Sequence, residues 1–376
     1  MKIAIIGPSY PFRGGLAANN DRMAIQFQDE GHDVVVYTFT LQYPKFLFPG
    51  KTQYSTDDAP FGIEIIRSIN SVNPINWLIV GRKIKKQKFD LVLIRFWLPF
   101  MGPCFGTLLR IIKSNKHTMI ISIVDNIIPH EKRIGDKLFT KYFIKPVNGF
   151  IGLSQIVVDD IGKFDSKKPK ALSPHPLFDN FGKIFSKEEA AKILGLDSSY
   201  RYILFFGLIR KYKGLDLLLQ AFADDRFRKK KIKLIIAGEY YVSDKEYLNL
   251  INKYKLDKDI IHVNRFIPDS EVANYFNMSD LVVQPYKSAT QSGVTQIAYH
   301  FNKPMIVTNV GGLAEICPDG KVGYVVPVDH NAIADAIIRF FEETNHAEMI
   351  KNIQTEKKKY SWNVLTKNIF KMFDAL

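Results

Sequence analysis

Short apolar runs alternate along the chain with longer segments in which apolar residues recur every three or four positions. Residues 2–7 and 33–39 form two apolar runs, and residues 16–30 between them have apolar positions at helical spacing. Short apolar runs indicate buried strands, whereas the helical spacing indicates an amphipathic helix. The beginning of the chain is therefore predicted to be a βαβ unit.

The same alternation continues through the chain in two series. The first series predicts further strands at residues 63–68, 91–96, 118–124 and 149–153. The second predicts strands at residues 202–207, 233–237, 260–263, 280–283, 304–308 and 322–326. Such alternation of strands and helices is typical of doubly wound α/β sheets, which bind ligands at the carboxyl ends of their strands. Two Rossmann-like domains that face each other across a ligand cleft are therefore predicted.

A stretch rich in Pro, Gly and Asn, residues 173–187, separates the two series and is interpreted as a linker. A chain of 376 residues is long enough for two domains of roughly 150–200 residues each. We place the N-terminal domain at residues 1–175 and the C-terminal domain at residues 188–358. His175 stands between two prolines in this stretch and is interpreted as structural.

The composition favours a soluble globular protein, since 46% of the residues are hydrophobic and 24% are charged. Two cysteines provide no disulfide framework, which favours a reducing compartment, and the N-terminus lacks the pattern of a signal peptide. The most hydrophobic stretch, residues 91–112, is interrupted by Arg95, Pro99 and Pro103. These interruptions argue against a membrane-spanning helix. A cytoplasmic protein is expected, in contact with the inner face of the plasma membrane only peripherally.

The net charge of +14 is unevenly distributed. Residues 51–150 contain 16 Lys and Arg against 7 Asp and Glu, including the sequence RKIKKQK at residues 82–88. A solvated helix face would explain this excess, and so would attraction to anionic lipid head groups or phosphorylated substrates. No nucleic-acid-binding module is recognisable, so nucleic acid is not an expected partner.

The loop that follows the strand at residues 202–207 has the residues of a diphosphate clamp. Gly207 ends the strand, and Arg210 and Lys213 stand just before a predicted helix. Helix N-termini, an Arg fork and a Lys ammonium are suited to hold phosphate groups. The alternative is that both cations simply face water, as basic residues near helix starts often do.

Residues 284–323 are predicted to form a strand, a polar loop, a helix, a second strand and a loop with Gly311-Gly312. The polar loop at residues 288–295 offers hydroxyls, amides and Gly293 for hydrogen bonds to sugar hydroxyls and phosphate. Ser292 or Thr290 would alternatively cap the following helix, and both roles can coexist.

Two loops of the first series are further candidates. Gly14-Gly15 follows the first strand and would allow close approach of a phosphate, although a plain tight turn has the same pattern. His130 follows the strand at residues 118–124 and could donate to a sugar hydroxyl or a phosphate. A loop histidine held by local hydrogen bonds is the alternative.

Several motifs in this order resemble the retaining GT-B glycosyltransferases of the glycosyltransferase-4 (group 1) type. They are IGPSYPFRGG at the start, FFGLIRKYKGLDLLLQAFA and LIIAGE in the second series, SDLVVQPYKSATQSGVTQIAYHFNKPMIVTNVGGLAEI after them, and YSWNVLTKNIFKMF at the end. The resemblance implies a nucleotide-diphosphate sugar as donor, no cofactor and no metal. It also implies that the acceptor binds the N-terminal domain and that the C-terminal helix, residues 360–376, packs back onto that domain.

The resemblance assigns roles to particular residues. Lys213 matches the lysine that holds the donor diphosphate, Leu208 stands where the family has an arginine, and Arg210 is expected to replace that arginine. Arg210, Lys213 and His130 are the expected catalytic residues. The expected donor-binding residues are Gly14, Gly15, Gly207, Gly238, Glu239, Ile267, Pro268, Thr290, Gln291, Ser292, Gly293, Val294 and Thr295.

The chain departs from the family in one respect. The family has two glutamates, separated by seven residues, that contact the donor sugar and its ribose. Thr290 or Gln291 stands near the first position, and Ile297 with the neighbouring Gln296 near the second. Neutral groups therefore replace two carboxylates, which leaves the donor sugar and the ribose contacts open.

The expected function is that of a retaining hexosyltransferase. It would move a sugar from the nucleotide donor to a hydroxyl of a glycan or lipid-linked acceptor, in bacterial-type surface polysaccharide or lipopolysaccharide synthesis. One alternative is a nucleotide-sugar 2-epimerase on the same fold, which would require acidic acid/base residues in the cleft. The other is a non-catalytic sugar-nucleotide-binding protein.

Overall fold

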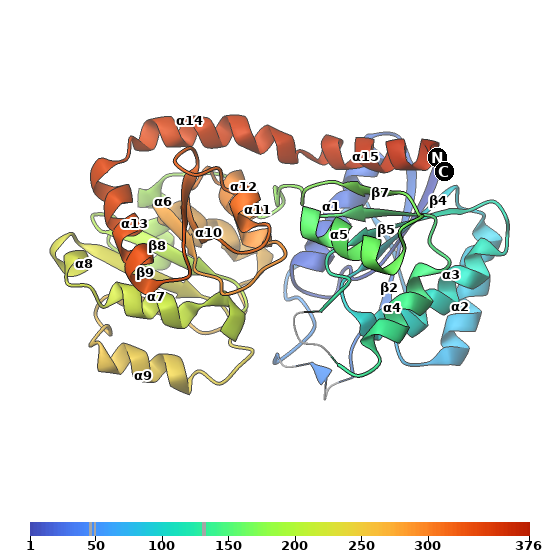
Figure 1. Ribbon diagram of the computed structural model, residues 1–376, viewed down its shortest axis with the longest axis horizontal. Helices are drawn as coiled ribbons and strands as arrows, with labels where there is room; N and C mark the ends of the chain where they lie inside the picture. Colours follow the sequence, from blue (N-terminus) through green and yellow to red (C-terminus); the bar gives the residue numbers. More distant parts are fainter. Residues whose placement is uncertain (45–46, 49, 130–132) are drawn as a thin grey trace. The chain divides into compact units, whose positions relative to one another are not determined.

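The computed structural model describes residues 1–44, 47–48, 50–129 and 133–376 (Figure 1). The chain forms two compact units. The first comprises Met1–Phe48, Thr52–Pro176 and Ser361–Leu376, and the second comprises Leu177–Tyr360 together with Gly50 and Lys51. The division falls within residues 173–187, the stretch interpreted as a linker.

The first unit contains a seven-stranded parallel sheet with strand order β3-β2-β1-β4-β5-β6-β7. Its strands are β1 (Lys2–Ile6), β2 (Asp33–Leu41), β3 (Glu64–Asn70), β4 (Leu91–Phe96), β5 (Met119–Val124), β6 (Gly149–Gly152) and β7 (Lys170–Leu172). β1 to β6 confirm the strands predicted from the apolar runs. β7 was not predicted, because it has only three residues and its side chains are incompletely buried.

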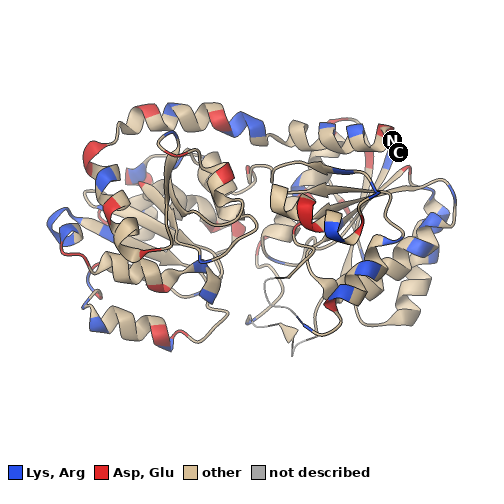
Figure 2. Cartoon of the chain, in the orientation of Figure 1, with Lys and Arg blue, Asp and Glu red and all other residues tan. Residues whose placement is uncertain are grey.

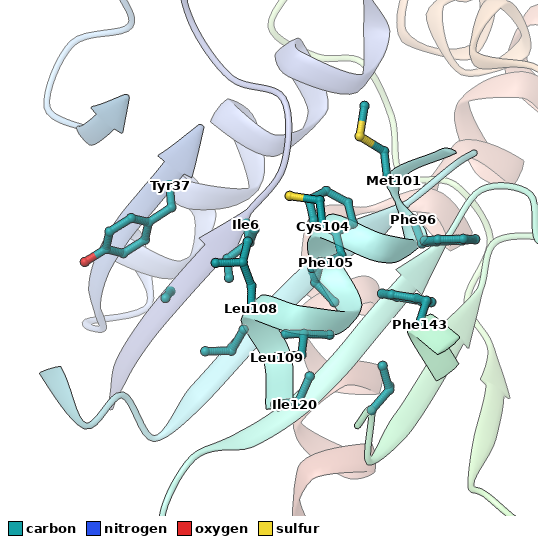
Figure 3. Close-up of a cluster of buried hydrophobic side chains, with 14 of the residues drawn as sticks. Ile6, Tyr37, Phe96, Met101, Cys104, Phe105, Leu108, Leu109, Ile120 and Phe143 are labelled. Carbon is teal, nitrogen blue, oxygen red and sulfur yellow. The ribbon is translucent and has the colours of Figure 1, made fainter. Parts of the chain in front are cut away.

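Helices cover both faces of this sheet, and the apolar side chains of its strands divide between two clusters. The helices of this unit are α1 (Gly15–Asp29), α2 (Pro74–Gln87), α3 (Gly102–Lys113), α4 (Asp136–Ile144), α5 (Gln155–Phe164) and α15 (Trp362–Asp374), with a short 3-10 helix η2 (Pro99–Met101) before α3. One cluster is packed by α2, α3 and α4, and includes Phe105, Leu109 and Phe143 (Figure 3). The other is packed by α1 and α15, and includes Phe27 and Trp362.

The C-terminal helix α15 belongs to the first unit. The Nε2 of Gln26 in α1 donates to Oδ1 of Asn363 at 2.7 Å, and the hydroxyl of Thr366 donates to the Glu30 carboxylate at 2.8 Å. The rings of Phe27 and Phe370 pack edge to face with centroids 5.7 Å apart. Polar and aromatic contacts thus join the two ends of the chain within one unit.

The second unit contains a six-stranded parallel sheet with strand order β10-β9-β8-β11-β12-β13. Its strands are β8 (Arg201–Phe206), β9 (Ile232–Ala237), β10 (Ile260–Val263), β11 (Leu281–Gln284), β12 (Met305–Thr308) and β13 (Gly323–Val326). Its helices are α6 (Lys187–Leu194), α7 (Leu215–Phe222), α8 (Arg226–Lys229), α9 (Lys245–Lys253), α10 (Val272–Met278), α11 (Gly293–His300), α12 (Leu313–Ile316), α13 (His330–Glu343) and α14 (His346–Glu356). Short 3-10 helices are η3 (Lys211–Lys213), η4 (Asp269–Glu271) and η5 (Lys357–Tyr360). All six predicted strands are present.

The strand orders place a change of winding direction in each sheet. β1 lies between β2 and β4 in the first sheet, and β8 lies between β9 and β11 in the second. Loops at the carboxyl ends of the strands diverge at such points, which makes them the preferred ligand sites of open α/β sheets. The two units are therefore Rossmann-like, and the loops after β1 and after β8 are where ligands are expected. No helix in the described parts of the chain is long and apolar enough to cross a membrane.

Candidate functional site

The loop after β8 is held close to the end of β9 by two glycines. Gly207 has a φ of +93°, in the region that favours glycine, and a Cβ on Gly238 would overlap the carbonyl oxygen of Gly207. The amide of Ile209 donates to the carbonyl of Glu239 at 2.8 Å, and the amide of Tyr241 donates to that of Ile209 at 3.0 Å. The two predicted glycines thus permit a backbone approach that no other residue allows.

The same loop is tied to the loop after β11. Gly214, between η3 and α7, has a φ of +67°, and a Cβ there would overlap the carbonyl oxygen of Pro285. The amide of Lys287 donates to the carbonyl of Tyr212 at 2.7 Å. The η3 turn with its basic side chains is therefore fixed against the neighbouring strand end.

Arg210 and Lys213 lie at the two ends of this turn, as predicted. Lys213 is half-buried, with its Nζ 5.6 Å from the centroid of the Tyr286 ring, and the Arg210 guanidinium lies 5.2 Å from the centroid of the Tyr241 ring. Burial, and then the positive charge of Arg210, lower the pKa of Lys213 to about 8. The two positive charges repel each other, and burial leaves the charge of Lys213 poorly solvated. An anion bound beside them would therefore stabilise both charges.

The loop after β11 leads into α11 through Ser292. The hydroxyl of Ser292 accepts a hydrogen bond from the amide of Val294 at 3.2 Å and lies 3.3 Å from the Tyr286 hydroxyl. The hydroxyl of Thr295 donates to the Ser292 carbonyl at 2.5 Å. Ser292, rather than Thr290, is therefore the N-cap. Gly293 begins the helix against the ring of Phe178, which leaves little room for a side chain.

The glycines after β12 complete the packing of these loops. Gly311 has a φ of +52°, and a Cβ on it would overlap the carbonyl oxygen of Ala289. The amide of Gly312 donates to the carbonyl of Thr290 at 3.3 Å. The loops after β8, β11 and β12 thus form a continuous arrangement of closely packed backbone at the carboxyl edge of the second sheet.

Two glutamine side chains in this region are buried without hydrogen-bond partners. Gln284 ends β11 and Gln296 lies one turn into α11; both are at most 1% exposed. Neither amide group bonds to another side chain or backbone group in the described parts of the chain. A buried amide without a partner is destabilising by about 1–3 kcal/mol. Gln296 stands beside the position of the second family glutamate and was considered for that reason. No local pattern in the sequence distinguishes Gln284.

The other predicted residues of the second unit also follow strand ends. Glu239, after β9, is 3% exposed, and Ile267 with Pro268 lies between β10 and η4. Thr290 and Gln291 are half-buried in the loop after β11. The structure therefore gathers the predicted residues of the second unit along the carboxyl edge of one sheet.

In the first unit, Gly14 and Gly15 lie where β1 leads into α1. Gly14 has a φ of +101° and precedes the helix, and the amides of Ala17 and Ala18 donate to its carbonyl. The predicted glycine turn is thus the start of α1 at the strand junction. His130 lies outside the described residues.

A buried polar cluster joins β4 and the end of β5 to α1. The Arg95 guanidinium donates to both carboxylate oxygens of Asp125, at 2.7 and 2.6 Å, and also to Oδ1 of Asn19. His175 Nδ1 donates to the carbonyl of Pro176 at 2.9 Å. Burial, and then the charge of Arg95, lower the pKa of His175 to about 4, so this histidine is neutral at pH 7. The interpretation of His175 as structural agrees with this position.

Comparison with known proteins gives one family match. Residues 186–357, somewhat less than half of the chain, match the family described as "Glycosyl transferases group 1". An uncharacterized glycosyltransferase of Methanocaldococcus jannaschii is 24% identical over 100% of this chain and 99% of its own length. A lipopolysaccharide 1,2-N-acetylglucosaminetransferase of Salmonella typhimurium is 30% identical over 43% of this chain and 44% of its own.

Solved structures are similar over the whole chain. Sucrose-phosphate synthase of Thermosynechococcus elongatus superposes with a TM-score of 0.76 at 16% identity, over 100% of this chain and 98% of its own. HepE of Anabaena, in complex with UDP-glucose, superposes with a TM-score of 0.72 at 15% identity, over the full length of both chains. The chain thus has the GT-B fold, and its C-terminal half matches group 1 glycosyltransferases.

Proposed function

We propose that this chain is a retaining hexosyltransferase that uses a nucleotide-diphosphate sugar as donor. The acceptor would be a hydroxyl of a glycan or of a lipid-linked sugar, in bacterial-type surface polysaccharide or lipopolysaccharide synthesis. The group 1 match supports sugar transfer, and the similarity to a lipopolysaccharide N-acetylglucosaminetransferase supports the acceptor class. The reaction is proposed to require no metal or cofactor and to take place in the cytoplasm.

The proposal that the donor is a nucleotide-diphosphate sugar rests on one structural observation. Lys213 and Arg210 are fixed in a glycine-bounded turn at the point where the second sheet changes direction. A diphosphate placed there would neutralise two neighbouring cations and raise the pKa of Lys213 from about 8, so that the lysine is fully protonated in the complex. The anion and the protonated lysine thus stabilise each other.

The chemistry follows from the leaving group. The acceptor oxygen attacks the anomeric carbon on the face from which the diphosphate departs, and the bond between this carbon and the phosphate oxygen breaks. The electron pair of that bond stays on the phosphate oxygen, which also takes the proton of the acceptor hydroxyl. Arg210, Lys213 and the first amides of α11 are proposed to stabilise the developing negative charge.

Donor selectivity is proposed to lie in neutral side chains. Thr290 and Gln291 line the loop after β11, and Gln296 offers an amide that has no partner in the described chain. An amide both donates and accepts, whereas a carboxylate only accepts. Sugar and ribose hydroxyls would therefore meet a mixed set of donors and acceptors.

Nucleotide-sugar binding followed by product analysis tests the proposal. A thermal-shift panel of UDP-, GDP- and other nucleotide sugars identifies the donor, because a ligand that binds the folded state raises its melting temperature. The selected donor is then incubated with short glycan and lipid-linked acceptors, and the anomeric configuration of the product is read by NMR. Transfer with retained configuration is expected. An inverted product would contradict the mechanism, and donor binding without transfer to any acceptor would favour a non-catalytic binding protein.

A further inference from the structure

The outer face of α2 combines exposed apolar and basic residues. Ile75, Leu78 and Ile79 are 70%, 41% and 47% exposed, and they lie at helical spacing along one side of the helix. Arg82 and Lys83, which are also exposed, continue the same side one turn further. An exposed helix face of this composition is unusual, since apolar side chains of a soluble helix normally face the core.

α4 presents a second face of the same kind. Ile134, just before the helix, is fully exposed, and Leu138 is 66% exposed one turn further. Lys137, Lys141 and Lys145 are exposed and recur every four residues beside this apolar line. The lysines and the apolar side chains therefore form two adjacent stripes along α4.

α3 holds the two faces in one rigid layer. In α2, a Cβ on Gly81 would press against the side chain of Ile111, and in α3 a Cβ on Gly106 would press against the ring of Tyr142. The Arg110 guanidinium lies 3.8 Å from the centroid of the same ring and donates to the Tyr142 carbonyl at 2.9 Å. Because α2, α3 and α4 cover the same core cluster, their outer faces point away from the sheet on one side.

The layer is strongly basic (Figure 2). The three helices, with the residues Lys88 and Lys145 that end α2 and α4, contain ten Lys and Arg and a single acidic residue, Asp136. None of these ten cations forms an ion pair with any residue whose position the structure describes. Their charge is therefore not neutralised by the described residues of the unit.

A basic hollow lies at the carboxyl ends of α3 and α4. It has a volume of about 370 Å³ and is lined by Arg110, Lys113, Ser114, Lys145 and Pro146. The Lys113 ammonium is fixed by a 2.8 Å hydrogen bond to the Pro146 carbonyl. Burial lowers the pKa of Lys113, which indicates that its charge is poorly solvated in the free protein. The hollow is large enough for a phosphate group.

We propose that the outer faces of α2 and α4, with the hollow between α3 and α4, form a surface that binds an anionic lipid bilayer. Lys137, Lys141 and the cations of the hollow would contact lipid phosphates, while Ile134, Leu138 and the apolar residues of α2 enter the interfacial region. A cation beside an anionic bilayer and an apolar side chain in its interface both favour binding. A basic face that contacts only water does not require exposed aliphatic side chains. The presence of both cations and aliphatic side chains therefore distinguishes this surface from a solvated basic face.

Two other occupants fit the surface less well. A second copy of the chain would place lysine against lysine and gain repulsion instead of attraction. A nucleic acid would use the cations, but the exposed aliphatic side chains offer it neither hydrogen bonds nor stacking surfaces. A bilayer uses both features at once.

Vesicle flotation of the full chain tests the proposal. Vesicles of phosphatidylcholine alone are compared with vesicles in which a third of the lipid is phosphatidylglycerol. Binding is expected only to the anionic vesicles. The Lys137→Glu/Lys141→Glu variant is expected to bind them at least about 25-fold more weakly, since each lost cation costs about fivefold and the introduced carboxylates add repulsion. The Ile134→Ser/Leu138→Ser variant is expected to bind anionic vesicles severalfold more weakly than the wild type. This difference should persist when both are compared in high salt, because salt screens the electrostatic attraction and leaves the apolar contribution.

Matched variants on the second unit provide the controls. Lys245→Glu/Lys253→Glu reverses two exposed lysines of α9, and Ile193→Ser/Leu248→Ser removes two exposed apolar side chains. Both are expected to float like the wild type. Equal binding to neutral vesicles, no binding to either kind, or equal losses in the control variants would each overturn the proposal. Lys213→Ala should float normally, so a failure of the proposed sugar transfer is distinguishable from a failure of this surface.

Discussion

Gly214 lies so close to Pro285 that any side chain on it would overlap the proline carbonyl oxygen, which joins the turn carrying Lys213 to the loop after β11. Gly214→Ala is therefore expected to lower the melting temperature and to weaken nucleotide-sugar binding. The natural control is Gly195→Ala, because Gly195 has nearly the same φ, +66°, but no atom within 4 Å of its Cβ position. That variant should show only the cost of the left-handed backbone, about 1–2 kcal/mol, with unchanged donor binding.

The difference between the two variants measures the effect of the contact between Gly214 and Pro285, separately from the cost of the left-handed backbone. Thermal unfolding followed by circular dichroism, with and without the nucleotide, measures both effects. Equal destabilisation of Gly214→Ala and Gly195→Ala, with donor binding unchanged in both, would show that the loop contact does not organise the site.

Donor binding should depend on pH through Lys213. The pKa of this lysine is about 8 in the free protein, and a bound diphosphate favours its protonated form. Binding therefore takes up a proton when the pH exceeds 8, and the Kd is expected to rise up to about tenfold between pH 7 and pH 9. Calorimetric titration at several pH values measures this rise.

A variant separates Lys213 from other titrating groups. Lys213→Met should bind weakly with a flat pH profile over the same range, whereas Lys211→Met, in the same turn but exposed, should keep the wild-type profile. A flat profile in the wild type, or an unchanged slope in Lys213→Met, would contradict the assignment of Lys213 to the diphosphate.

Stability should fall in mild acid because of His175. Its pKa is lowered to about 4 in the folded protein, so that between pH 6.5 and pH 4 the unfolded chain binds a proton that the folded chain does not. Stability rises with pH wherever the unfolded state binds more protons. His175 should accordingly account for a loss of about 2 kcal/mol in unfolding free energy between pH 7.5 and pH 5.

Urea unfolding at the two pH values measures this contribution. His175→Asn should lose less stability on acidification than the wild type, whereas His330→Asn, which changes a partly exposed histidine, should lose as much as the wild type. The same loss in His175→Asn and in the wild type would mean that His175 is protonated in the folded state at pH 5.

Gln296 should affect stability and function in opposite directions. Its buried amide has no partner in the part of the chain that the structure describes, so Gln296→Met is expected to raise the unfolding free energy by about 1 kcal/mol. The same variant should bind the donor at least tenfold more weakly if the amide contacts the sugar nucleotide. Unfolding and ligand titration of one preparation provide both numbers.

Gln26→Met is the matched control, because the Gln26 amide donates to Asn363 and to Glu30. This variant is expected to lower the unfolding free energy and leave donor binding unchanged. Destabilisation of Gln296→Met by as much as Gln26→Met, with donor binding intact, would remove Gln296 from the site.

The sequence predicts those parts of the fold and site whose signals are local. The apolar runs identified twelve of the thirteen strands in the described parts of the chain, and Lys213 before an apolar helix indicated the turn in which the diphosphate clamp is proposed. β7 was missed because three partly exposed residues carry too weak a pattern.

Long-range relationships could not be read in the same way. Arg95 looked like an interruption of an apolar strand, and only the structure shows that it pairs with Asp125, which follows the neighbouring strand β5. The close approach of Gly214 to Pro285 likewise joins loops that are far apart in sequence. The burial of Gln284 and Gln296 depends on how α11 packs, which composition alone does not reveal.

The proposed diphosphate clamp is tested most directly by the turnover of sugar transfer in Lys213→Ala and Arg210→Ala, measured with saturating donor and compared with Lys211→Ala. Removal of a charged group that stabilises the departing diphosphate is expected to lower the rate by about 10²–10³. The exposed Lys211 should matter by no more than about threefold, since solvent-exposed charges contribute little. Turnover of Lys213→Ala and Arg210→Ala within the same threefold range would contradict the proposed diphosphate clamp.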